Sequence, residues 1–178
     1  MQEDLDRVLF DQAAIHRRLD EIADQISQDY RNRELTVVAI LNGSLIFAAD
    51  LLRRLPLPLR LDCLSVASYY GRTKPSIEPA FRQLDLPDIT GRHVLVLDDI
   101  LDSGMTLSAV CERFAQADTL SVRTCVLLEK KKSRKRPIQP DYVGFQIDDE
   151  FVVGYGLDYM EKYRNLPCIG VLQSSLIQ

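Results

Sequence analysis

Apolar residues along this chain recur with two different periods, and the two periods alternate. Between residues 11 and 28, Ile15, Leu19, Ile22 and Ile26 repeat at the spacing of one helix face. Residues 35–41 instead form a nearly continuous aliphatic run, which is typical of a strand buried on both faces of a parallel sheet. Further strand-like runs lie at 59–68, 94–97 and 122–129, and helical patterns at 45–55, before Pro56, and after Thr106, where Leu107, Val110 and Phe114 share one face. The alternation predicts an α/β fold whose central, mostly parallel sheet is flanked by helices.

Three shorter strand candidates, 142–145, 151–155 and 168–172, are separated by polar turns. We expect them to form a small cap beside the main sheet rather than to continue it. The segment from Tyr69 to about Gly91 is long for a connection without structure, so we expect a flexible flap there. The 178 residues are then a single domain, with its core at about 30–135 and its cap built from 1–15 and 140–178.

Composition excludes several classes of protein. The net charge of -4 gives no general attraction to nucleic acid. No apolar run approaches the roughly 20 residues that span a bilayer, and the first residues are acidic rather than signal-like, so we expect a cytoplasmic protein. The four cysteines are far apart in sequence, which favours reduced thiols, and with only two histidines a histidine-rich metal centre is not expected.

One segment is strongly basic: residues 130–136 contain six cations in seven positions. Such a run could bind RNA, a membrane surface or a pyrophosphate, but it is more often an exposed, solvated loop. Base-stacking aromatics are absent inside it, and Asp148, Asp149 and Glu150 follow nearby. We expect a solvated loop and keep an RNA-binding regulator as the alternative from another class of function.

The candidate chemistry lies in residues 93–107, where an apolar run ends in two adjacent carboxylates, Asp98 and Asp99. Open α/β sheets bind ligands at the carboxyl ends of their strands. Asp102 follows, and then a small, hydroxyl-rich turn opens the next helix; its residues are Ser103, Gly104, Met105 and Thr106. Backbone N–H groups at a helix start attract phosphate. Read without the rest of the string, the paired acids could equally be a solvated turn, and Asp102 or Ser103 only a helix N-cap.

A phosphate bound at this turn would be repelled by the carboxylates, so Asp98 and Asp99 are better suited to sugar hydroxyls or a cation. Mg²⁺ is the fitting ion because it prefers carboxylate and water oxygens and bridges phosphates. Asp102 is then left to exchange a proton with a second substrate. The chain has neither the Gly-x-x-x-x-Gly-Lys-Ser/Thr motif of P-loop ATPases nor a complete dinucleotide-binding glycine motif.

The same string resembles the phosphoribosyl-pyrophosphate (PRPP) signature of type I phosphoribosyltransferases, and most closely the hypoxanthine-guanine group. The resemblance covers most of the chain, from about Val37 to Leu172. Residues 41–44 are similar to the pyrophosphate loop of the family, which contains a cis peptide without proline. Ser68 and Tyr69 are similar to the start of its flexible catalytic loop. The segments that match its purine-binding region are 141–145, 151–159 and 163–167.

This resemblance implies the type I phosphoribosyltransferase fold, a purine salvage activity that yields IMP or GMP from PRPP, a Mg²⁺ cofactor, and a homodimer or homotetramer. The implied catalytic residue is Asp102, acting at purine N7. The implied PRPP-binding residues are Asp98, Asp99, Ser103, Gly104, Met105, Thr106, Asn42, Gly43 and Arg164. The implied purine-binding residues are Ile100, Phe151, Val152, Asp158 and Gln139, and the implied metal ligands are Asp98, Asp99 and Asp158.

Two positions depart from the family pattern. Gln139 stands where many relatives have a lysine that donates to the purine 6-oxo group, and a neutral amide donates more weakly than an ammonium. One of the lysines between 130 and 135 is the alternative donor. Asn42 stands where lysine or arginine is frequent, which leaves less positive charge against pyrophosphate. A preference for xanthine or adenine therefore remains an alternative.

Overall fold

The computed structural model describes residues 1–67, 80–81 and 87–177. The flap residues Ser68 and Tyr69 lie outside this part. The strands are β1 (Leu5–Phe10), β2 (Leu35–Leu41), β3 (Leu59–Ala67), β4 (Ala80–Phe81), β5 (His93–Leu101), β6 (Ser121–Lys130), β7 (Tyr142–Ile147), β8 (Val152–Val153) and β9 (Ile169–Leu172). The helices are α1 (Gln12–Asp29), α2 (Leu45–Leu52) and α3 (Met105–Phe114), with single 3₁₀ turns at Gln2–Asp4 and Ser174–Leu176.

Six strands form the central sheet in the order β4-β3-β2-β5-β6-β7. The five strands from β3 to β7 in this order are parallel, and only β4 is antiparallel, to β3. The predicted α/β fold with a mostly parallel sheet is confirmed. The chain leaves β2 towards β3 on one side and continues through β5, β6 and β7 on the other. The strand order therefore reverses between β2 and β5, which is where open sheets form a crevice at their carboxyl ends.

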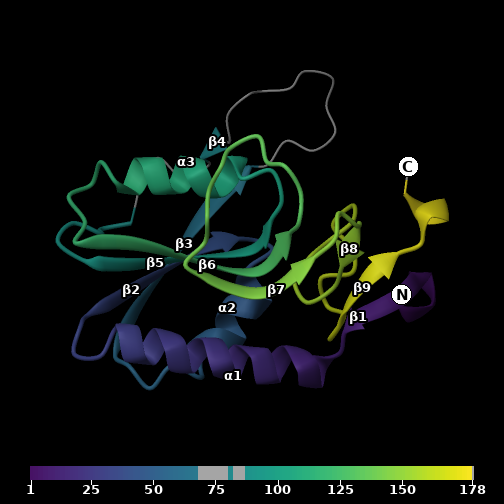
Figure 1. Cartoon of the computed structure of the whole chain (residues 1–178), viewed down its shortest axis with the longest axis horizontal. Helices are drawn as coiled ribbons and strands as arrows, with labels where there is room; N and C mark the ends of the chain where they lie inside the picture. The colour runs from purple at the N-terminus through teal and green to yellow at the C-terminus, as the bar shows by residue number, and fades with distance from the viewer. Residues whose placement is uncertain (68–79, 82–86, 178) are drawn as a thin grey trace.

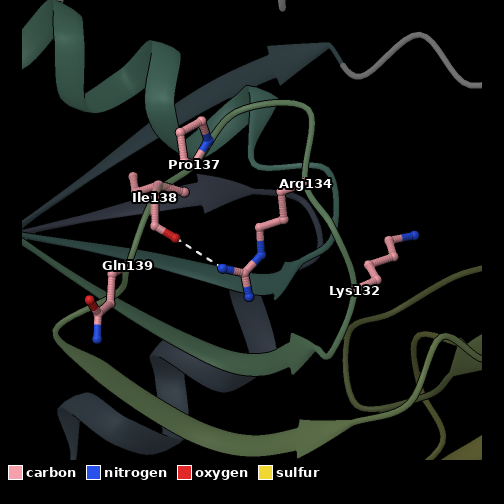
Figure 2. A pocket seen from close by; sticks show the side chains of 5 residues that line it. All are labelled: Lys132, Arg134, Pro137, Ile138 and Gln139. Atoms are coloured by element: carbon pink, nitrogen blue, oxygen red, sulfur yellow. Dashed lines mark hydrogen bonds between the residues drawn. The ribbon is translucent and has the colours of Figure 1, made fainter.

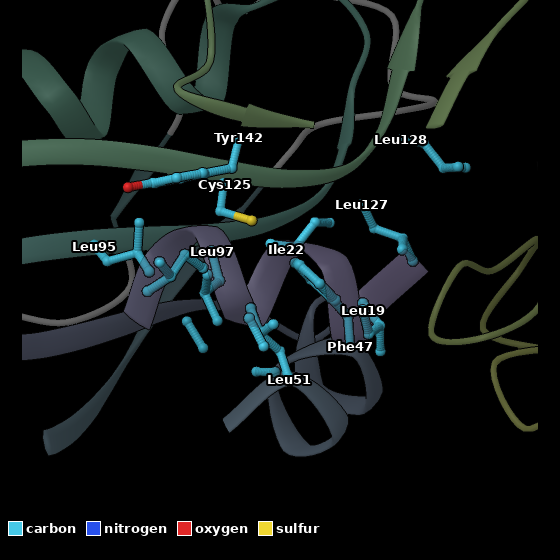
Figure 3. Close-up of a cluster of buried hydrophobic side chains, with 14 of the residues drawn as sticks. Leu19, Ile22, Phe47, Leu51, Leu95, Leu97, Cys125, Leu127, Leu128 and Tyr142 are labelled. Atoms are coloured by element: carbon cyan, nitrogen blue, oxygen red, sulfur yellow. The ribbon is translucent and has the colours of Figure 1, made fainter. Parts of the chain in front are cut away.

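Helices cover both faces of this sheet, with α1 and α2 on one face and α3 on the other (Figure 1). The periodicity that predicts the first helix is confirmed: the expected face of α1 is fully buried, and Asp11 caps the helix by accepting a 2.7 Å hydrogen bond from the Ala14 N–H. The core on that side joins the two helices to the central strands through Leu19, Phe47, Leu97 and Leu127 (Figure 3). A second core lies under α3.

A separate three-stranded sheet, β1-β9-β8, stands beside the central one and is called the hood below (Figure 1). It joins the two ends of the chain, since Leu5 pairs with Leu172. The expected cap strands at 151–155 and 168–172 belong to it as β8 and β9. The expectation for 142–145 is wrong, because β7 pairs in parallel with β6 and is the last strand of the central sheet.

Two predicted boundaries also change. The second helix ends at Leu52 rather than Leu55. Beyond it, the N–H groups of Arg54 and Leu55 donate to the carbonyls three residues earlier, of Leu51 and Leu52, instead of four residues earlier as in an α-helix. The strand predicted at residues 94–97 is longer than expected: β5 runs from His93 to Leu101, so it contains both Asp98 and Asp99. All four cysteines are free thiols. Among the helices that the structure describes, none is long and apolar enough to cross a membrane.

Candidate active site

The turn at Asn42, Gly43 and Ser44 follows the carboxyl end of β2, beside the position between β2 and β5 where open sheets form a crevice. The peptide before Asn42 is cis without proline, as the resemblance implies. Ser44 is fully buried, and its hydroxyl donates a 2.6 Å hydrogen bond to the Ile40 carbonyl, which closes the turn onto the end of β2. Gly43 lies against the Asp99 carboxylate so closely that a Cβ at Gly43 would stand 1.6 Å from Oδ2. Only glycine allows this approach.

The two carboxylates predicted to meet sugar or metal lie side by side on β5. Asp98 is only 7% exposed, and Asp99 is partly buried. Burial raises the pKa of Asp98 well above its ordinary value, and the adjacent charge of Asp99 raises it further. Burial also raises the pKa of Asp99, although the Ile100 N–H and the Arg164 guanidinium act in the opposite direction. A buried pair of acids is suited to accept hydrogen bonds or to face a cation.

The predicted phosphate turn lies between β5 and α3. Gly104 has the left-handed conformation, with φ of 78°, and is the residue before the first turn of α3. A Cβ on Gly104 would meet the Arg136 carbonyl oxygen at 2.3 Å, and the Arg136 N–H donates to the Ser103 carbonyl. The loop after β6 therefore packs directly on the turn. The Ser103 hydroxyl accepts from the Met105 N–H at 3.4 Å, and Ser103, Met105 and Thr106 are all partly exposed.

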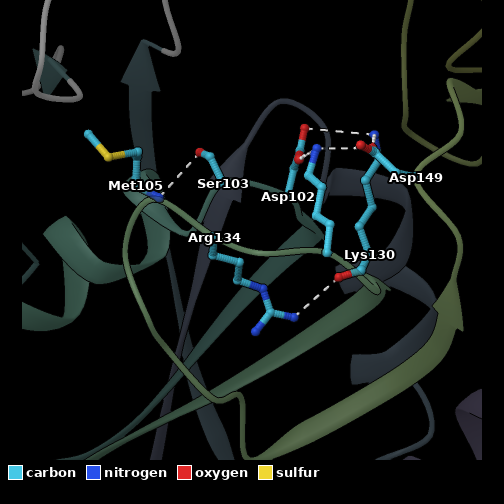
Figure 4. A network of polar contacts seen from close by, with 7 residues as sticks. Asp102, Ser103, Met105, Lys130, Arg134 and Asp149 are labelled. Atoms are coloured by element: carbon cyan, nitrogen blue, oxygen red, sulfur yellow. Dashed lines mark hydrogen bonds and ion pairs between the residues drawn. The ribbon is translucent and has the colours of Figure 1, made fainter.

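Three cations of the basic segment are not solvated as expected. Lys130 is only 8% exposed; its ammonium lies 3.1 Å from Asp149 and 3.8 Å from Asp102 (Figure 4). Lys132 pairs with both of the same acids, directly with Asp102 and at 2.9 Å from Asp149. Arg134 pairs with Glu129. The solvated-loop prediction is therefore wrong for these residues: the segment folds over the carboxylate that is the candidate acid–base group.

The hood supplies the rest of the site. Val152 is buried where β8 pairs with β9, whereas Phe151 is 40% exposed and meets Tyr159 edge-to-face at 5.3 Å. Arg164 donates a 2.6 Å hydrogen bond to the Gly156 carbonyl and lies 2.7 Å from Asp158. The second Asp158 oxygen accepts from the Glu161 N–H, so both oxygens already have partners.

Gly156 joins the hood to the crevice. A Cβ on this residue would lie 2.1 Å from the Gly43 carbonyl oxygen, and its φ of 103° is one that side chains rarely adopt. The contacts of Gly156 with Gly43, and of Gly43 with Asp99, bring three segments together that are far apart in sequence. Among the predicted residues, this places Asp98, Asp99, Asn42, Gly43 and Arg164 around one crevice.

Two predicted purine-binding residues stand further out. Ile100 is half-buried and packs against the core on the α1 side. Gln139 lies on the far limb of the loop after β6 and is exposed (Figure 2). This loop encloses a hollow of about 400 Å³ lined by Lys132, Arg134, Pro137, Ile138 and Gln139. The sequence left Lys132 as one of several alternative donors between residues 130 and 135 and assigned no role to Asp149. The acidic residues that follow β7 were the signal for such a role, since they could balance the basic segment.

Comparison with known proteins places these residues in a family. Residues 8–160 match the family model described as phosphoribosyl transferase domain. The chain is 38% identical to the hypoxanthine-guanine phosphoribosyltransferase of Bacillus subtilis, over all of this chain and 99% of that protein. It is 40% identical to the protein of the same name from Staphylococcus epidermidis, covering 99% of this chain and 98% of that one.

Solved structures show the same similarity in three dimensions. A hypoxanthine phosphoribosyltransferase from Staphylococcus aureus superposes with a TM-score of 0.94, at 40% identity, over all of this chain and 97% of that one. A hypoxanthine phosphoribosyltransferase from Trypanosoma cruzi superposes with a TM-score of 0.89, at 35% identity, over 97% of this chain and 94% of that one.

Proposed function

The chain belongs to the phosphoribosyl transferase family, and from this premise we propose a purine salvage enzyme: hypoxanthine or guanine reacts with PRPP to give IMP or GMP and pyrophosphate. The observation that carries the proposal is the meeting of three segments at the end of the sheet. Carboxylates of β5, the turn after β2 and the hood arginine surround one crevice. A sugar carrying phosphates at two positions needs such a set of groups.

In this proposal PRPP binds along the crevice. The turn from Ser103 to Thr106 holds the 5'-phosphate through backbone N–H groups at the start of α3, with two hydroxyls alongside. Asp98 and Asp99 accept hydrogen bonds from the ribose hydroxyls, which offsets the burial that raises their pKa values. The pyrophosphate meets the turn at Asn42 and Gly43 and the Arg164 guanidinium, which is a bidentate donor suited to phosphate.

The residues present also fit Mg²⁺. Within the described residues no three His, Cys, Asp or Glu side chains form a ready metal cage. Mg²⁺ usually binds through one or two carboxylates together with substrate phosphates, and the pair Asp98 and Asp99 supplies such carboxylates beside the proposed sugar site. Asp158 is the proposed ligand of a second ion, and it would exchange its contact with Arg164 for the metal. The ion would neutralise charge on the leaving pyrophosphate.

The base binds between the hood and the loop after β6. Phe151 stacks on the purine from its exposed position, and the backbone of Val152 reads its edge. Asp102 exchanges the proton at N7 as the base attacks the anomeric carbon, pyrophosphate leaves from the opposite side, and the configuration inverts.

Assembly and location complete the proposal. For the Trypanosoma cruzi hypoxanthine phosphoribosyltransferase, the C-terminal region has a role in the oligomeric state and the enzymatic activity. We propose a homodimer or homotetramer for this chain as well. The free thiols of all four cysteines fit a reducing compartment such as the cytoplasm.

The test is a panel of four free bases, hypoxanthine, guanine, xanthine and adenine, each incubated with purified protein, PRPP and Mg²⁺. Nucleotide formation is measured by chromatography and pyrophosphate release by a coupled assay. We expect IMP and GMP, with little or no product from adenine. A protein that releases no pyrophosphate with any of the four bases would refute the proposal, and a preference for adenine would refute its purine specificity.

A further inference from the structure

We propose that Lys132, rather than Gln139, is the residue that selects 6-oxo purines in this enzyme, and that Asp149 positions it. The inference rests on the proposed function, because it assumes that a purine meets Asp102. Lys132 belongs to a segment whose charge alone suggested a solvated surface, yet its ammonium lies against the proposed acid–base group.

The Lys132 ammonium contacts the Asp102 carboxylate directly and lies 2.9 Å from Asp149. The side chain is 28% exposed, so the ammonium is only partly shielded from solvent. These contacts raise the pKa of Lys132, chiefly through its hydrogen bond with Asp102, so the amine is charged at neutral pH. The Lys132 ammonium therefore lies beside Asp102, the carboxylate that contacts the purine in the proposed mechanism.

The hydrogen-bonding groups of purines explain how an ammonium in this position would discriminate between bases. The atom N7 and the substituent at C6 lie on the same edge of a purine: guanine shows two acceptors there, N7 and O6, whereas adenine shows the acceptor N7 and an amino donor. A base whose N7 meets Asp102 consequently presents its C6 substituent to a neighbour of Asp102. An ammonium in that place donates to a 6-oxo group. It opposes a 6-amino group, because both groups are donors and neither accepts a hydrogen bond from the other.

Gln139 is less well placed for the same task. Gln139 is exposed, and within the described residues its side chain takes part in no hydrogen bond that would orient it. Lys132 and Gln139 line the same hollow from opposite limbs of the loop after β6 (Figure 2), and of the two only Lys132 contacts Asp102 and Asp149. Since Lys132 reaches Asp149 in the segment that leads to β8, it extends towards the hood and its purine-binding residues.

Asp149 has a positioning role in this arrangement. It contacts Lys130 at 3.1 Å and Lys132 at 2.9 Å, so it holds both ammoniums from the hood side while Asp102 holds them from the β5 side (Figure 4). When the N7 atom of a bound purine contacts Asp102, Lys132 keeps its contact with Asp149 and donates its remaining N–H groups to O6. Lys130 stays buried between the two acids and balances their charge.

The experiment compares Lys132→Met with Lys131→Met in the full-length protein. Both changes remove one positive charge from neighbouring positions, but Lys131 is exposed and pairs with neither acid. We expect Lys132→Met to lower kcat/KM for hypoxanthine and guanine about ten- to hundredfold, mainly through KM, as the loss of one base-reading contact does. Turnover of adenine, or its inhibition constant if turnover is undetectable, should stay the same or improve. Lys131→Met should behave as the wild type.

Two further variants make the outcome decisive. Lys132→Gln keeps a neutral donor and should fall between wild type and Lys132→Met, and Asp149→Asn should raise KM for 6-oxo purines with little change in kcat. If Lys132→Met lowers the values for all bases equally, or leaves discrimination intact while Gln139→Ala abolishes it, the inference is overturned. A wild-type protein that makes no IMP or GMP would instead refute the proposed function itself, so the two failures are distinguishable.

Discussion

Gly156 offers the sharpest test of how the hood is coupled to the crevice. A Cβ added there would lie 2.1 Å from the Gly43 carbonyl oxygen, whereas real Cβ atoms essentially never come closer than 3.0 Å to such an atom. Gly156→Ala must therefore separate the hood from the turn after β2 by about 0.9 Å. Since a misplacement of about 1 Å can lower catalysis roughly 100-fold, we expect a loss of that size in kcat/KM.

The same substitution has a backbone effect, because φ of 103° is unfavourable for alanine. Strain of this kind costs about 1–3 kcal/mol of folding free energy, and the clash adds to it. Gly91→Ala is the matched control: Gly91 also has a positive φ, of 66°, but nothing lies within 4 Å of an added Cβ. It should lose about 1 kcal/mol and keep full activity.

Urea denaturation gives the stability of both variants, and steady-state kinetics with PRPP and hypoxanthine gives their activity. We expect activity to separate the two variants far more than stability does. Gly156→Ala with kcat/KM within about threefold of the wild type would refute this expectation, because the turn after β2 would then not depend on the hood for its position.

Three further outcomes are expected. Asp102→Asn should lower turnover at least about 100-fold while leaving PRPP affinity, measured by calorimetry, nearly unchanged; an equal loss of both would make Asp102 structural. Asp98→Asn should abolish activity yet stabilise the free protein by about 0.5–2 kcal/mol near pH 7, because the raised pKa of Asp98 means that its charged form opposes folding. The gain in stability should vanish below about pH 4, where the carboxyl is protonated in both the folded and the unfolded state. Urea denaturation measured across this pH range would contradict the prediction if the gain did not change with pH. Tyr155→Phe removes a 2.5 Å hydrogen bond to Asp50 and should lower the free energy of unfolding by about 1–2 kcal/mol; a change below about 0.3 kcal/mol would show that the bond contributes nothing.

Much of the central sheet could be predicted because its strands carry strong local signals. The aliphatic run of β2 is buried on both faces, and its observed bounds, Leu35–Leu41, are those expected from the pattern. The placement of β7 could not be predicted in the same way. Its residues alternate between more and less buried positions, which suits a strand of either sheet. The pairing with β6 depends on a close approach of the β7 backbone to Leu127, because a Cβ at Gly144 would stand 2.3 Å from the Leu127 carbonyl oxygen.

The candidate site likewise combines residues that the sequence predicts with contacts that only the fold creates. The carboxylates and the phosphate turn occur together in one stretch of sequence, so they could be found without coordinates. The ion pairs of Lys130 and Lys132 join three separate stretches, and nothing local distinguishes these lysines from Lys131, which stays exposed. A charge-rich loop is expected to be solvated until the fold shows which acids lie opposite. Contacts of this kind depend on topology, which pattern reasoning gives only coarsely.

The hood imposes an order on folding. Its pairing of β1 with β9 joins Leu5 to Leu172, almost the full chain apart, whereas every neighbouring pair in the central sheet lies within residues 35–147. Contacts between distant residues form late, because a long loop must close before they contribute. During synthesis, β1 emerges before β2 to β8 and cannot pair until β9, at Ile169–Leu172, has been made. The nascent protein can therefore assemble the strands that carry Asp98 and Asp99 before the hood adds Arg164 and the purine-binding residues.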